Sequence, residues 1–334
     1  GTGTLKLRAA DATSAAVMDV GVSTTGTANS LTATVDLTDH DADLLVTSLT
    51  LADRSAGTGA TTATMSLNEG HLVADTLVLA RRTGTGTGNA AATLNLGDGV
   101  AAGVATTAIG SVTMAVNTSS GGAVSANFNI TGGDVTIGTG SGTAINMANA
   151  GAGRSVDANI DLSGGNVTVS GNIIRTGGAG TENATVILNG SHLDMSGNSI
   201  GSSVSPILLS AQSGSLTNLA GLNSGGTLTK SSPDILTLGN GNTFTGGVNV
   251  AEGTLLANNT TGSATGSGTV SVDAGTILGG DGIIAPGADE LIIVDGDLIV
   301  GLPTAVAGSD LALTTSGSGS TTLNGKVGFD IFSG

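Results

Sequence analysis

The sequence predicts an all-β protein, and specifically a right-handed parallel β-helix (a β-solenoid) of roughly 11 coils. Short runs in which apolar and polar residues alternate recur along the chain, as expected for strands with one buried face. These runs return at intervals of about 30 residues, which is typical of repeat architectures. Trp and Tyr are absent and Phe occurs four times, which fits a narrow interior filled by aliphatic side chains.

The repeat is clearest in the first 200 residues. Each repeat begins with a five-residue strand, followed by a polar corner, a second strand and often a third. We expect the first residue of this strand, an alanine, to fit a tight corner, and the polar residue after it to hydrogen-bond along the stack. The opening strands are Ala33–Leu37, Ala63–Leu67, Ala92–Leu96, Ala126–Ile130, Ala158–Leu162 and Ala184–Leu188, with start-to-start spacings of 30, 29, 34, 32 and 26 residues.

The glycine pair Gly132-Gly133 separates two alternating runs and has the form of a hairpin turn. Because the same pattern returns in each repeat, we interpret the pair as a corner between two strands of one coil. The run Ala126–Ile130 is therefore predicted to pair with Ala92–Leu96 and Ala158–Leu162 in neighbouring coils.

Composition divides the chain into three consecutive parts. Residues 1–200 hold β-helix coils with the repeat described above. Residues 201–234 include Pro206 and are less regular, which we interpret as a shift in register between two solenoid segments. Residues 235–334 hold further coils with a different sequence pattern.

Residues 235–284 match a longer motif, which covers about 50 residues in a fixed order. The motif resembles the passenger-associated repeat of autotransporters and of large exported bacterial β-helix proteins. This resemblance implies a structural β-helix segment that is exported to the bacterial cell surface and folds outside the cell. The matching elements are Leu236–Leu238, Asn242–Gly247, Val250–Leu255, Gly266–Val270 and Ala274–Gly280.

The charge balance restricts the partners of the protein. The formal net charge is −16, from 9 Lys and Arg against 25 Asp and Glu. Such a negative field repels phosphate backbones, so we expect no nucleic-acid binding. No apolar run approaches the ~18 residues that a transmembrane helix needs, so we expect no membrane insertion.

Four aspartates, Asp36, Asp39, Asp41 and Asp43, cluster with His40 in the sequence DLTDHDAD. Calcium prefers several carboxylate oxygens gathered at one turn, so these aspartates are a candidate Ca²⁺ site. The alternative is a solvated acidic corner without a metal. The glycine-rich nonapeptide of calcium-binding β-rolls is absent, which favours that alternative.

Three histidines, His40, His71 and His192, fall at the same corner of their repeats. His40 and His71 belong to consecutive coils and could form a metal pair or a pH-sensitive stack. The simpler interpretation is that each is a polar corner residue. The run Gly84–Gly88 is similar to a phosphate loop but lacks the following Lys-Ser/Thr.

No catalytic residue or cofactor site is assigned from the sequence. Many β-helix proteins process glycans, which requires convergent carboxylates in a groove, usually with aromatic side chains that stack on sugars. Asp134 and Asp161 lie in adjacent coils but at different offsets from the start of their repeats. We therefore predict that the protein is not an enzyme.

The sequence instead predicts a structural extracellular protein that assembles end to end into a filament or sheath on the bacterial cell surface. The expected partner is another copy of the chain, joined head to tail through terminal strands. This expectation rests on strand-like runs at Gly1–Leu7 and Lys326–Gly334 that no capping segment covers. Two alternatives are an adhesin stalk that displays a separate binding module and a glycan-processing β-helix enzyme.

Overall fold

A computed structural model of the protein describes all residues except 1–3, 10, 12, 25, 27, 98–105, 120, 141, 301–310 and 330–334, and describes the backbone alone at Asp39 and Phe329. The described elements are β-strands, many of them paired in parallel, so the all-β prediction is confirmed. Among these residues no helix has the length and apolar character needed to cross a membrane. Residues 330–334 of the predicted strand-like run Lys326–Gly334 lie outside the described residues.

Two compact units make up the chain, and the division falls within one strand, β11 (Thr181–Asp194). The first unit comprises Gly1–Ile187 and Val204–Leu208, and the second comprises Leu188–Ser203 and Leu209–Gly334. Besides the start of β11, the first unit contains β1 (Leu5–Leu7), β2 (Ala16–Val20), β3 (Leu31–Arg54), β4 (Thr61–Arg82), β5 (Ala90–Leu96), β6 (Thr106–Asn117), β7 (Ala123–Ile137), β8 (Thr143–Ala150), β9 (Ser155–Val169) and β10 (Asn172–Arg175). The second unit contains β12 (Ser199–Ile200), β13 (Leu208–Thr217), β14 (Gly221–Leu222), β15 (Leu228–Gly239), β16 (Val248–Asn258), β17 (Val270–Val272), β18 (Ile277–Gly280), β19 (Ile283–Ile284), β20 (Ile292–Val294), β21 (Asp297–Val300), β22 (Ala312–Leu313), β23 (Thr321–Leu323) and β24 (Val327–Phe329).

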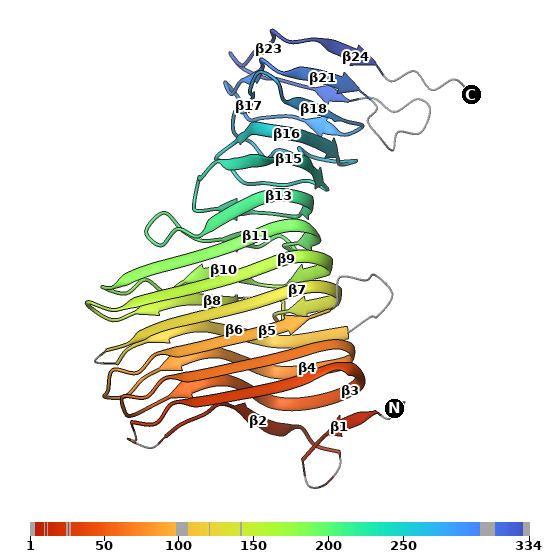
Figure 1. Ribbon diagram of the computed structural model, residues 1–334. Helices are drawn as coiled ribbons and strands as arrows, with labels where there is room; N and C mark the ends of the chain where they lie inside the picture. The colour runs from red at the N-terminus through yellow and green to blue at the C-terminus, as the bar shows by residue number, and fades with distance from the viewer. Residues whose placement is uncertain are drawn as a thin grey trace. The chain divides into compact units, whose positions relative to one another are not determined.

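Successive repeats of the first unit lie side by side as parallel strands (Figure 1). Ala126–Ile130 of β7 pairs residue for residue with Ala92–Leu96 of β5 and with Ala158–Leu162 of β9, which confirms the predicted pairing. Alternation along β7 buries Phe128 completely and leaves Asn127 on the outer face. Equivalent apolar residues therefore stack in columns from one repeat to the next.

The alanine that recurs in these strands lies in a different place from the one predicted. Ala63, Ala92, Ala126 and Ala158 share one register position inside their strands, and each is at most 1% exposed. The prediction of a tight corner at this position was wrong, because the alanine lies inside a strand. Alternation places its side chain on the buried face, as it does for the residue two positions later. The outward residue after it does hydrogen-bond along the stack at Asn159, whose Nδ2 donates to Oδ1 of Asn127 at 3.3 Å.

The glycine pair in β7 forms a bend within a continuous strand and not a hairpin turn. Residues after the bend, Asp134–Ile137, pair with β6 on one side and with β9 on the other. Gly133 has a φ of 83°, in the left-handed region that glycine adopts without steric cost. The equivalent Gly165 in the next repeat has a φ of 75°. The two halves of β7 therefore pair with neighbouring repeats and not with each other.

Replacing Gly165 with alanine is expected to lower the free energy of unfolding by about 1–3 kcal/mol. A Cβ there would lie 2.4 Å from the carbonyl oxygen of Gly133, in addition to the strain of the positive φ. Gly153→Ala is the matched control, because Gly153 has a φ of 70° but its added Cβ would meet nothing within 4 Å. Urea unfolding should show the larger loss for Gly165→Ala, and equal losses would contradict the role of close stacking at the corner.

A second bend recurs near the end of the third strand run in four successive repeats of the first unit. Its central residue is an alanine in the left-handed conformation, which is uncommon for any residue other than glycine. The bend interrupts the alternation, so that the residue two positions later, such as Arg54 or Arg82, is buried. The four alanines, each 0% exposed, are Ala52 (φ 57°), Ala80 (φ 56°), Ala115 (φ 52°) and Ala148 (φ 51°).

The second unit repeats the parallel pairing with shorter strands. Residues at the end of β15 pair with β16, and those of β16 pair with β18. The buried Asn242 fixes the corner after β15, because its Oδ1 accepts from the backbone N–H of Leu219 at 2.8 Å and its Nδ2 donates to the carbonyl of Ala264 at 2.7 Å. One side chain thus joins three consecutive layers of the backbone.

Candidate functional site

An open cavity of about 420 Å³ lies at the acidic corner predicted from the sequence. It is formed between β1 and the first bend of β3 in the first unit. Asp36 and His40 supply titratable groups, and the described residues that line the cavity are Thr4, Leu5, Asp36, Leu37 and His40.

Asp36 is exposed, and its carboxylate binds the following turn. Its Oδ1 accepts from the hydroxyl of Thr38 at 2.7 Å and from the backbone N–H of Thr38 at 3.1 Å. These two hydrogen bonds, the hydroxyl first, lower the pKa of Asp36, and the nearby His40 adds a small effect in the same direction. The carboxylate therefore stabilises a local turn and keeps its negative charge.

Asp43 is neutralised by cations from the strand beside it. Nη2 of Arg8 donates to Oδ1 of Asp43 at 2.6 Å, and Nζ of Lys6 lies 3.8 Å from Oδ2. The hydrogen bond from Arg8, followed by the positive charges of Arg8 and Lys6, lowers the pKa of Asp43. Asp41 has a separate partner, since its Oδ2 accepts from the hydroxyl of Thr4 at 2.8 Å.

The predicted calcium ligands thus bind different partners. Asp36 binds its own turn, Asp41 binds Thr4 and Asp43 binds Arg8. The side chain of Asp39 lies outside the described part of the chain. Among the described side chains, no three His, Asp or Glu residues lie together in a way that could hold one metal ion. A Ca²⁺ site that uses all four aspartates stays a prediction.

The three histidines have different surroundings. His40 is exposed and lines the cavity. His71 is in register with Asp43, and its charge contributes to the lowered pKa of that aspartate. His192 belongs to the second unit, where its Nδ1 lies 2.5 Å from the hydroxyl oxygen of Ser215. The three histidines therefore do not share one environment, and the interpretation of each as a polar corner residue stays a prediction.

The carboxylates considered for glycan chemistry occupy different register positions. Asp134 is opposite Asn166, whose Nδ2 donates to its Oδ1 at 2.8 Å. Asp161 is in register with Asn129, on another strand run of the repeat. The backbone pairing therefore does not place Asp134 and Asp161 opposite each other.

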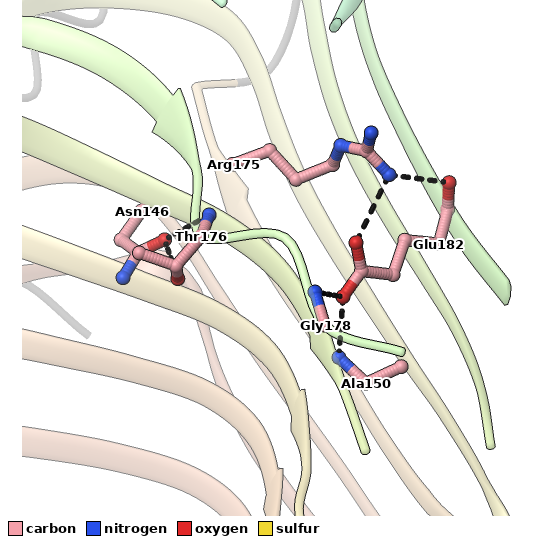
Figure 2. Close-up of polar contacts among 6 residues, drawn as sticks. All are labelled: Asn146, Ala150, Arg175, Thr176, Gly178 and Glu182. Carbon is pink, nitrogen blue, oxygen red and sulfur yellow. Dashed lines mark hydrogen bonds and ion pairs between the residues drawn. The ribbon is translucent and has the colours of Figure 1, made fainter. Parts of the chain in front are cut away.

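A buried ion pair in the first unit was not predicted from the sequence (Figure 2). Nη1 of Arg175 lies 3.0 Å from Oε2 of Glu182, and the two side chains are 14% and 2% exposed. Oε1 of Glu182 also accepts from the backbone N–H groups of Ala150 at 2.7 Å and Gly178 at 2.6 Å. The carboxylate thus connects the loop before β11 to the end of β8, and its contacts are those of a structural clamp.

A buried lysine in the second unit was also missed. Lys230 is 0% exposed, and its Nζ donates to the carbonyl and to the hydroxyl of Ser232 and to the carbonyl of Glu252 at 3.3 Å. Burial lowers the pKa of Lys230, while the negative charges of Asp234 and Glu252 oppose that shift. The inward alternation Leu228, Lys230, Ser232 was the available signal, because it places a lysine on the apolar face of a strand.

Comparison of the chain with protein-family models, with curated proteins and with solved structures found no match in any of the three.

Proposed function

We propose that the chain is a right-handed parallel β-helix of roughly 11 coils that serves as a structural protein at the bacterial cell surface. Copies of it assemble head to tail into an extracellular filament or sheath. The residue-for-residue parallel pairing between successive repeats supports this proposal, because further layers can add in the same way at an open edge. The resemblance of residues 235–284 to exported passenger-associated repeats supports the location.

The observation that carries the proposal is the side of β1 and β2 that faces away from β3, where the described part of the chain places no further strand. Both strands pair with β3, and they lie on one side of it in the first unit (Figure 1). Two large apolar side chains of these strands are exposed, Leu5 at 47% and Val17 at 65%. An edge of this kind is a template for another strand.

A corresponding edge occurs in the second unit. Strand β23 pairs with β20, and β24 pairs with β21. Leu323 and Val327 in these strands are 43% and 47% exposed. An edge in one unit that accepts a different edge of another copy makes a heterologous contact, which propagates into a filament instead of closing into a ring.

Electron microscopy of the purified protein tests the proposal, with filaments as the expected result. The double variant Leu5→Lys/Val17→Lys should raise the concentration needed for assembly by at least about tenfold, because a buried unpaired charge costs more than the ~1.4 kcal/mol that a tenfold change represents. The control Val204→Lys/Leu208→Lys makes the same change in charge at residues that are 87% and 63% exposed and should assemble normally.

Dispersed wild-type particles at every concentration would overturn the filament proposal. That result would favour the adhesin stalk, in which the β-helix displays a separate binding module and does not associate with itself. Equal loss of assembly in both double variants would show that added positive charge, and not the open edge, is responsible.

A further inference from the structure

Asparagine is followed directly by glycine at three places in the chain, Asn189, Asn240 and Asn324. Glycine has no side chain to shield its backbone nitrogen, and its backbone dihedral angles are the least restricted of any residue. That nitrogen can therefore attack the side-chain amide of the asparagine before it. Because the three pairs share this chemistry, the folded structure decides how their reactivities differ.

Asn189 is held inside a strand. Asn189 and Gly190 both belong to β11, which pairs with β9 on one side and with β13 on the other. Oδ1 of Asn189 also accepts a hydrogen bond from the hydroxyl of Ser213 at 3.0 Å. Strand pairing fixes the backbone, and the side-chain hydrogen bond fixes the amide group. Attack by the nitrogen of Gly190 therefore requires local opening of the sheet.

Asn324 is held by both of the groups that would have to react. Its Nδ2 donates to Oδ1 of Asp295 at 2.6 Å, and the backbone N–H of Gly325 donates to the carbonyl of Val294 at 3.3 Å. A Cβ added to Gly325 would lie 1.6 Å from the carbonyl oxygen of Gly296, so this glycine is packed against the neighbouring layer. Both hydrogen bonds must break before the nitrogen of Gly325 can reach the amide carbon.

Asn240 lacks these restraints. Asn240 and Gly241 follow the end of β15 at a bend outside the strands, and Asn240 is exposed. Within the described part of the chain, the side chain of Asn240 forms no hydrogen bond, and the backbone N–H of Gly241 has no acceptor. Neither reacting group has to leave a partner, and the exposed side chain is free to turn toward the nitrogen of Gly241.

We propose that Asn240 is a site of spontaneous deamidation in the folded protein. The backbone nitrogen of Gly241 attacks Cγ of Asn240, and the new C–N bond closes a cyclic imide. The Nδ2 group leaves as ammonia together with the proton of the Gly241 amide. Water then adds to either carbonyl of the imide and opens the ring to aspartate or to isoaspartate. The reaction consumes only water and needs no oxidant or cofactor.

The isoaspartate product alters a closely packed corner. It inserts an additional methylene group into the main chain directly before Gly241, where an added Cβ would already lie 3.1 Å from the carbonyl oxygen of Thr261. The next residue is the buried Asn242, whose side chain bonds to the backbones of Leu219 and Ala264. Displacing Asn242 breaks this link between layers, so isoaspartate at position 240 destabilises the second unit.

Tandem mass spectrometry of protein kept folded in mildly alkaline buffer measures the loss of amide at each site. Asn240 should convert at least about tenfold faster than Asn189 or Asn324, a factor that corresponds to ~1.4 kcal/mol of local opening. In urea that unfolds the chain, the three sites should convert at similar rates, because glycine follows each of them. Equal rates in the folded protein, or a faster rate at Asn240 in urea as well, would overturn the assignment of the site to the fold.

Two variants test the reaction and its effect on the corner. Asn240→Gln should show no fast conversion, because its longer side chain closes a ring less readily. Asn240→Asp carries the charge of the product without the additional methylene group. The isoaspartate form, separated by chromatography, should therefore unfold at a lower temperature than Asn240→Asp, and equal unfolding temperatures would overturn the effect on the corner. None of these results bears on filament formation, so the two proposals fail separately.

Discussion

Replacing Glu182 with alanine is expected to lower the free energy of unfolding by about 3–5 kcal/mol, which is the cost of breaking a buried ion pair by removing one partner. The carboxylate accepts from Arg175 and from the backbone N–H groups of Ala150 and Gly178. Alanine would leave all three donors without this acceptor, in a region where the Arg175 side chain is 14% exposed. Urea unfolding measures the loss.

Two further variants separate the clamp from a general effect of removing a carboxylate. Glu182→Gln retains an acceptor oxygen but loses the charge, so its loss of stability should be smaller than that of Glu182→Ala. Glu69→Ala removes an exposed carboxylate from the same unit and should change stability by no more than about 0.5 kcal/mol. Hydrogen exchange should accelerate at the amides of Ala150 and Gly178 in Glu182→Ala alone. Similar losses in Glu182→Ala and Glu69→Ala would contradict the clamp.

Strand pairing in the first unit could be predicted because two independent patterns agree. Alternation assigns an inward face, and the repeat of about 30 residues assigns which strands are neighbours. Together they correctly gave the register of Ala126–Ile130 with both adjacent repeats. The bend at Gly132-Gly133 followed from the same repetition, since a local pattern alone favours a hairpin.

The buried side chains of Glu182 and Arg82 could not be predicted by the same means. Glu182 follows a glycine-rich loop, where a charged residue is normally exposed to solvent. Its carboxylate instead accepts hydrogen bonds from Arg175 and from the backbone N–H groups of Ala150 and Gly178. Arg82 is inward only because Ala80 adopts a left-handed conformation, and alanine gives no sequence signal for that. Both cases depend on where a loop or a bend directs a side chain, which the period of the pattern does not specify.

The acidic corner shows a different limit of the sequence, because residues that are close in sequence need not share a binding partner in the structure. The sequence offered Asp36, Asp39, Asp41 and Asp43 as a candidate Ca²⁺ site and favoured a solvated acidic corner as the alternative. Along a strand, however, residues two positions apart lie about 7 Å apart, and each then meets a different neighbour. Thr4 and Arg8, which flank β1, are the neighbours of Asp41 and Asp43, and neither was considered as a partner from the sequence.

The free energy of unfolding is expected to rise with pH in the alkaline range because of Lys230. Burial lowers the pKa of Lys230 in the folded protein below its ordinary value of 10.5. Between the lowered pKa and 10.5, the unfolded chain still holds a proton that the folded chain has lost. Stability therefore increases with pH in this window, by up to about 1.4 kcal/mol per pH unit, and levels off above it. Below the lowered pKa, Lys230 is protonated in both the folded and the unfolded chain, so folding carries the full cost of burying its charge.

This chain is well suited to measuring that slope. It contains no Tyr or Cys, and its only lysines are Lys6, Lys230 and Lys326. Urea unfolding from neutral pH to about pH 10.5 should therefore show the rise in wild type and in the control Lys326→Met, whose side chain is exposed, but not in Lys230→Met. Methionine fills a similar volume without a charge, so the variant isolates the ammonium group from its packing. Parallel pH profiles for wild type and Lys230→Met would show that Lys230 keeps its proton in the folded protein throughout this range.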